Sequence, residues 1–112
     1  MDKAQLLAPR LDQGEVEIPG VGTVTVRALS RFEMLSVERL QSKGTLVYER
    51  AVLALGMIDP ALTEDEIAQW QKVSPAAEIN VVAARINQLS GIGKGAAKSD
   101  VPDDGEQPGP GV

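Results

Sequence analysis

The stretch TLVYERAVLALGMI, residues 45–58, decides the fold expected for this chain. Wound as a helix, it is apolar over most of its circumference, and only Glu49 and Arg50 carry charge. A helix that is apolar on nearly every side must be buried. We therefore expect residues 45–58 to form the central helix of a small core, with Leu53 inside it.

Two further helices are expected after the central one. Pro60 ends it, because proline disfavours helix in the residue before it. Thr63 and Glu66 form the capping-box pattern T-x-x-E, which predicts a helix that runs to about residue 73. Pro75 suits the first position of a last amphipathic helix, and Gly91 suits the residue after its end.

A β-hairpin is expected before the central helix. Residues 15–18 and 23–27 alternate apolar and polar side chains, which is the pattern of half-buried strands. Pro19-Gly20-Val21-Gly22 between them is typical of a hairpin loop. Because a lone hairpin is marginal in water, its Val and Ile face should lie against helices.

A helix over residues 31–41 is expected between the hairpin and the central helix. Ser30 and Glu33 form another capping box, and Leu29 pairs with Met34 as a hydrophobic staple. The apolar residues expected to face the core are Phe32, Met34, Leu35, Val37 and Leu40.

Together these elements predict a mainly α fold with a small N-terminal β-hairpin, of the α+β class. About four helices should form one compact domain with the hairpin over residues 15–91. Residues 1–14 should be a loosely ordered N-terminal segment. Residues 92–112 are rich in Gly and Pro and too poor in apolar residues to repay ordering, so a flexible, disordered C-terminal tail is expected there.

Composition removes several classes of function. The 112 residues carry a formal net charge of -5, which disfavours nucleic acid and anionic membrane surfaces as partners. There is no Cys and no His, so thiol nucleophiles, imidazole bases and the usual zinc ligands are excluded. The longest apolar run, residues 51–58, is far shorter than the roughly 20 residues of a spanning helix. We predict no catalytic, cofactor-binding or metal-binding residue, and therefore no enzyme and no cofactor.

One apolar stripe is a candidate partner-binding surface. Ile67, Trp70 and Val73 recur at helical spacing, and they include the only Trp of the chain. Such a stripe is more often core, whereas a partly exposed Trp is the residue type most enriched at binding hot spots. Both interpretations stay open. The acidic run from Glu64 to Glu66 is interpreted as helix-start carboxylates rather than as a metal site.

The order of the elements resembles that of a known protein family. The chain reads VEIPGVGTVTVR (16–27), ALSRFE (28–33), YERAVLALGM (48–57), DPALTEDEI (59–67) and INVVAARINQLSG (79–91). This order resembles the tail assembly chaperones of long-tailed, siphovirus-type bacteriophages over about residues 15–91. The likeness is one of pattern and supplies no invariant motif from which binding residues could be carried over.

The resemblance implies a non-enzymatic protein in the cytoplasm of the infected bacterium, absent from the mature virion. Its implied partners are the phage tape measure protein, which it binds, and the tail tube protein, whose polymerisation it promotes. Homo-oligomerisation also stays open. In the family, a programmed ribosomal frameshift often yields a longer product, and the codons of Gly93-Lys94 could form such a slippery site.

Two other classes fit the same composition. One is a structural head-tail connector or minor tail component, which would remain in the purified particle. The other is a small bacterial regulatory module that binds another protein.

Overall fold

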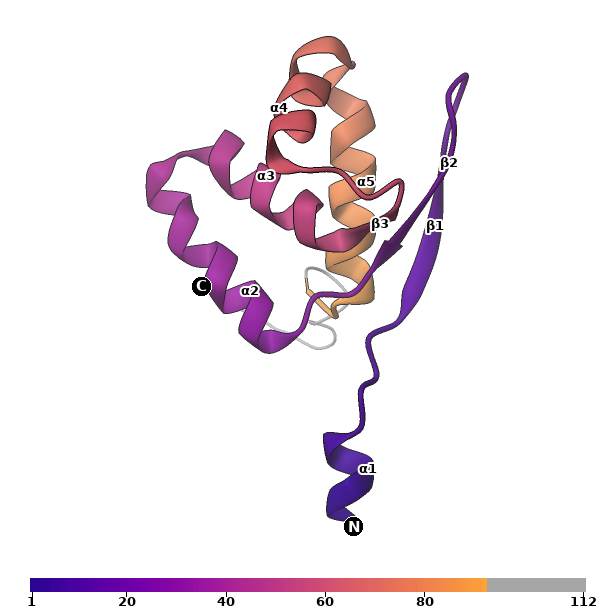
Figure 1. Cartoon of the computed structure of the whole chain (residues 1–112), viewed down its shortest axis with the longest axis vertical. Helices are drawn as coiled ribbons and strands as arrows, with labels where there is room; N and C mark the ends of the chain where they lie inside the picture. Colours follow the sequence, from indigo (N-terminus) through magenta and orange to yellow (C-terminus); the bar gives the residue numbers. More distant parts are fainter. Residues whose placement is uncertain (93–112) are drawn as a thin grey trace, which may run out of the picture.

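The structure, a computed structural model, describes residues 1–92 and is mainly helical, with an antiparallel sheet of three strands (Figure 1). The elements are α1 (Lys3–Leu7), β1 (Gln13–Ile18), β2 (Gly22–Arg27), α2 (Arg31–Glu38), the 3₁₀-helix η1 (Arg39–Lys43), α3 (Thr45–Gly56), β3 (Met57–Asp59), α4 (Glu64–Val73) and α5 (Ala76–Leu89). The predicted fold class is confirmed. The tail expected at 92–112 lies, apart from Ile92, outside the described residues.

The predicted hairpin is formed by β1 and β2. Val16 lies opposite Val24 in the antiparallel register, and both are buried, as are Ile18 and Val26. Successive side chains of a strand point to opposite faces, so these apolar residues all lie on the face of the hairpin that packs against the helices. The tight loop contains Gly20 with a φ of 79°, a left-handed conformation that glycine adopts without steric cost. β1 begins at Gln13, two residues before the expected start.

The third strand corrects the prediction that the central helix reaches residue 58. α3 ends at Gly56, and Met57–Asp59 pairs with β2, with Met57 opposite Val26 and Asp59 opposite Thr25. Proline at position 60 already disfavours helix at Asp59, and the ladder satisfies backbone groups that a frayed helix end would leave unpaired. A strand of three residues at the end of an apolar run leaves no periodicity to recognise.

α3 is central, but only its second half is buried. It packs against α2, η1, α4 and α5. Its buried residues are Ala51, Val52, Leu53 and Gly56, whereas Leu46 in the first turn is 59% exposed. The expectation of burial along the whole helix is therefore wrong for its first turns. Leu53 is fully buried, as predicted.

Both capping boxes are present. In α2, Ser30 Oγ accepts from the Glu33 N–H at 3.1 Å and the Glu33 carboxylate accepts from the Ser30 N–H at 3.0 Å. In α4, Thr63 and Glu66 exchange the equivalent bonds. The helix expected over residues 31–41 is α-helical only to Glu38 and then tightens into η1, as the last turns of helices often do.

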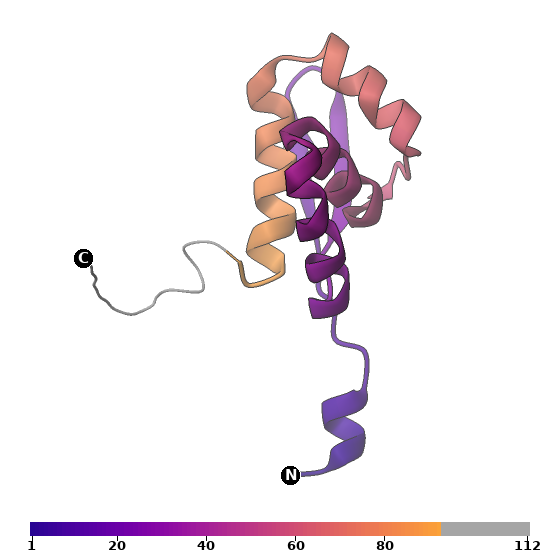
Figure 2. The same ribbon diagram turned by 90° about the vertical axis from the view of Figure 1, so that its left-hand side faces the viewer.

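α5 covers the hairpin and contacts α3 (Figure 2). Val82 and Ile86 of α5 are fully buried, together with Val26 of β2. α1 is different, because it contains no buried residue and stands away from the remaining elements in both views (Figures 1 and 2). None of the helices in residues 1–92 has both the length and the apolar content needed to cross a bilayer.

Candidate protein-binding groove

The predicted stripe of Ile67, Trp70 and Val73 is divided by the structure. Ile67 is fully buried in the core and offers no surface to a partner, which corrects its assignment as a contact residue. Trp70 is half-buried and packs against the core, whereas Val73 is 74% exposed. The three residues therefore share a helix side without forming one surface, and only Trp70 and Val73 remain open to the partner-binding hypothesis.

Trp70 also joins two helices. Its indole Nε1 donates a hydrogen bond of 2.7 Å to Glu78 Oε2, in the first turn of α5. A half-buried indole N–H needs such a partner. The sequence pattern could not show this contact, because the packing of α4 against α5 brings the two side chains together.

The acidic run at the start of α4 serves the helix. Glu64, Asp65 and Glu66 are all exposed, and Glu66 is occupied by its bond to the Thr63 N–H. Within residues 1–92, no group of three or more His, Cys, Asp or Glu side chains is placed to hold a metal ion.

An exposed apolar groove lies beside α2, away from the stripe on α4. Its volume is about 510 Å³, and we call it the α2 groove. Its lining residues are Leu11, Arg27, Ser30, Phe32, Glu33, Ser36 and Leu55. Phe32 is 80% exposed, and Leu35 on the same helix is 46% exposed. An exposed aromatic side chain at an apolar concavity marks a protein-interaction site more often than a scattered surface residue does.

Phe32 and Leu35 correct the prediction that they face the core. α2 buries only Met34 and Val37, three residues apart. The helical neighbours it packs against are α3 and η1, so only one narrow side of it is covered. Leu40 packs partly against the core as expected.

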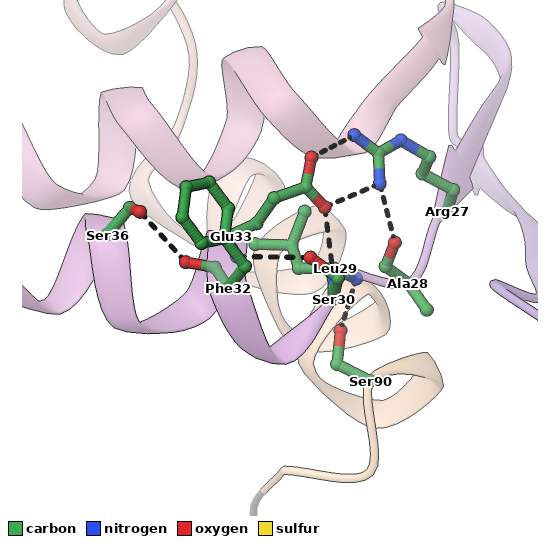
Figure 3. Close-up of polar contacts among 8 residues, drawn as sticks. All are labelled: Arg27, Ala28, Leu29, Ser30, Phe32, Glu33, Ser36 and Ser90. Atoms are coloured by element: carbon green, nitrogen blue, oxygen red, sulfur yellow. Dashed lines mark hydrogen bonds and ion pairs between the residues drawn. The ribbon is translucent and has the colours of Figure 1, made fainter. Parts of the chain in front are cut away.

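The polar side of the groove is an ion pair with two hydrogen bonds (Figure 3). Arg27 Nη1 donates to Glu33 Oε1 at 2.9 Å, and Nη2 donates to Oε2 at 2.8 Å. Arg27 Nη1 also donates to the Ala28 carbonyl at 2.9 Å. Glu33 Oε1 accepts in addition from the Ser30 N–H, so the end of β2 and the start of α2 are held by one carboxylate.

This pairing sets the protonation of both groups. The hydrogen bonds from Arg27, with a smaller contribution from the Ser30 backbone N–H, lower the pKa of Glu33 from 4.5 to about 2, although partial burial opposes the shift. The hydrogen bond to Glu33 raises the pKa of Arg27. Both groups are charged at neutral pH, and their shifts have a structural cause.

The start of α2 is also fixed from α5. The Leu29 N–H donates to Ser90 Oγ at 2.8 Å (Figure 3). Ser90 Oγ donates in turn to the Ile86 carbonyl at 2.7 Å. The serine therefore links Leu29, which precedes the N-cap of α2, to the last turn of α5. Sequence reasoning found the capping role of Glu33 but missed Arg27 and Ser90, because their contacts depend on how the strand and α5 meet α2.

The polar groups that line the groove already have hydrogen-bond partners within the chain. Both oxygens of Glu33 already accept hydrogen bonds, Ser30 Oγ accepts from the Glu33 N–H, and Ser36 Oγ donates to the Phe32 carbonyl at 2.8 Å. None of these groups is poised as a base or a nucleophile. What remains for a ligand is the apolar surface of Phe32, Leu11 and Leu55.

Comparison of the chain with models of protein families, with curated proteins and with solved structures finds no significant match.

Proposed function

We propose that this protein is a bacteriophage tail assembly chaperone that holds a helical segment of the tape measure protein in the α2 groove until tail tube subunits replace it. The observation that carries the proposal is Phe32, 80% exposed at an apolar groove whose polar groups are already paired within the chain. The resemblance over residues 15–91 supplies the biological setting.

The apolar lining of the groove favours an amphipathic helix as ligand. Such helices bind by placing apolar side chains, spaced three or four residues apart, into an apolar groove. Leu11 and Leu55 line the groove beside Phe32, and Leu35 extends the apolar surface along α2. The Arg27–Glu33 pair keeps its own hydrogen bonds when a partner covers it, so covering it leaves no unpaired charge.

Binding through one aromatic side chain and a few leucines would be exchangeable. A chaperone that tube subunits displace must dissociate rapidly from its partner. The affinities of related interfaces differ mainly in the dissociation rate, so a small interface suits this role. The net charge of -5 favours encounter with a basic segment of the partner.

The test measures binding of the tape measure protein encoded in the same genome. Phe32→Ala should weaken binding by roughly 10- to 100-fold, since burying a Phe contributes about 1.5–3 kcal/mol. Val21→Ala is the matched control, because Val21 is also strongly exposed, at 74%, and lies in the hairpin loop. Circular dichroism of each variant checks that the fold is retained.

Other outcomes separate the alternatives. Full affinity of Phe32→Ala, combined with loss on Val73→Ala, would place the binding surface on α4 instead. Finding the protein in purified virions would favour a head-tail connector or minor tail component. A gene that lies outside the interval between the tube and tape measure genes would favour a regulatory module. The proposed frameshift at Gly93-Lys94 lies outside the described residues, and the gene sequence tests it.

A further inference from the structure

We infer that the N-terminal arm of this chain, residues 1–11 with α1, docks into the α2 groove of a second copy, so that two copies exchange arms. The inference does not depend on the proposed function, because it concerns only the contact of this chain with itself.

The arm carries apolar side chains that its own chain leaves uncovered. Leu6 is 54% exposed, Leu7 is 72% exposed and Leu11 is 45% exposed. α1 is five residues long and buries none of them. An isolated helix of that length is unstable in water, so α1 needs a surface that covers it.

The arm is held out from its own groove. Arg10 Nη1 donates to the carbonyls of Gln5 at 2.9 Å and Leu6 at 3.0 Å, which ties the segment after α1 to the end of that helix. The ring of Pro9 fixes one backbone angle between them. The Asp12 carbonyl already accepts from the Ala28 N–H at 2.8 Å, so the chain is anchored to β2 from there on.

Residues 8–11 therefore form a short connection between α1 and the strand that is anchored to β2. A connection this short opposes a turn of α1 back over its own groove. Both views show the arm pointing away from the other elements (Figures 1 and 2).

The position of the arm suits reciprocal exchange. Leu11 lines the α2 groove, so the arm leaves the domain at the edge of the groove. A two-fold axis beside that edge brings each arm to the other groove, and both contacts form together in one self-complementary interface. Leucines of the arm would then meet Phe32 and Leu55.

The area predicts a weak dimer. At roughly 30 Å² for each methyl or methylene group, the exposed parts of Leu6, Leu7 and Leu11 amount to roughly 200 Å² per arm. Two arms with the groove surfaces they cover bury on the order of 800 Å², below the about 1,200 Å² at which stable specific interfaces begin. The exchange should therefore be reversible and appear at high protein concentration.

The experiment is sedimentation of the full chain from about 10 µM to 1 mM, a range chosen for weak association. The mass should rise from 11.9 kDa towards twice that value with concentration. Leu6→Ser/Leu7→Ser in the arm and Phe32→Ser in the groove should each raise the dimer dissociation constant at least tenfold, whereas Val21→Ser should leave it unchanged. A mixture of the arm variant and the groove variant should associate more than either variant alone, because one arm and one groove remain intact, but less than the native chain, because only one of the two contacts can form.

A disulfide trap identifies whose groove is occupied. The chain has no cysteine, so Leu7→Cys and Ser36→Cys can be combined without side reactions. Exchange predicts disulfide-linked dimers on oxidation at high concentration. A bond within one chain that is independent of dilution would overturn the inference, as would a monomer up to 1 mM or a dimer that tolerates the arm variant. The assay contains no tape measure segment, so its failure leaves the proposed function standing.

Discussion

Replacing Gly56 by alanine tests how closely α3 packs against α5. Gly56 is the last residue of α3 and is buried. A Cβ built on it would overlap Ile86 Cδ1 and lie 2.9 Å from Ile86 Cγ1 and 3.1 Å from Cγ2. Ile86 is fully buried and β-branched, so it cannot turn away without disturbing the core.

Two opposing effects set the size of the change. Overpacking of a well-filled core costs about 1–3 kcal/mol. Alanine recovers at most about 1 kcal/mol through its helix propensity and the lower entropy of the unfolded chain. We therefore expect Gly56→Ala to lower the free energy of unfolding by about 1–2 kcal/mol, which lowers Tm by roughly 4–15 °C in a domain of this size.

Urea denaturation followed by circular dichroism measures the change, and a double-mutant cycle assigns its cause. Ile86→Val removes Cδ1 and alone costs about 0.5–1.5 kcal/mol. The double variant should lose less than the sum of the single losses, by at least about 0.5 kcal/mol. The matched control is Gly14→Ala, because the three atoms nearest to an added Cβ all belong to the end of the Arg85 side chain, which can move. A neutral Gly56→Ala, or additive losses, would refute the reasoning.

Two further predictions concern Glu33 and Leu53. The pKa of Glu33 is lowered to about 2, so its contribution to stability is fully present above about pH 4.5 and is lost as pH falls towards 2. The unfolding free energy of Glu33→Gln should be lower than that of the native chain by up to about 3 kcal/mol at pH 7. If this difference in unfolding free energy does not shrink between pH 4.5 and 2, the ion pair is contradicted. Leu53 is fully buried, and Leu53→Ala should cost about 2–5 kcal/mol in equilibrium denaturation, with a loss well under about 1 kcal/mol ruling out its core role.

Local signals predicted most of the secondary structure. The capping boxes at Ser30 and Thr63 placed the first residues of α2 and α4, because those hydrogen bonds involve only residues three apart. The alternating pattern and the Pro-Gly loop predicted the hairpin for the same reason. Each of these features depends on neighbours within a few positions, which the sequence displays directly.

The candidate site could be predicted far less well. The periodicity of the stripe on α4 left a core role and a partner-binding role both open, whereas in the structure Ile67 is fully buried and Trp70 is tied to Glu78. Phe32 was expected inside and is exposed beside the groove. Hydrophobic periodicity shows that a helix has an apolar side, but it does not show how much of that side a neighbour covers.

The sequence by itself determined that this chain folds around Leu53 as a mainly helical domain with a hairpin, since apolar periodicity and capping are local and additive. The tertiary structure alone decided that Met57–Asp59 joins the sheet, that Arg27 meets Glu33, and that the apolar surface of α2 stays open. These outcomes depend on the angles and distances between elements far apart in the chain. Packing fixes those quantities only when all the elements are assembled.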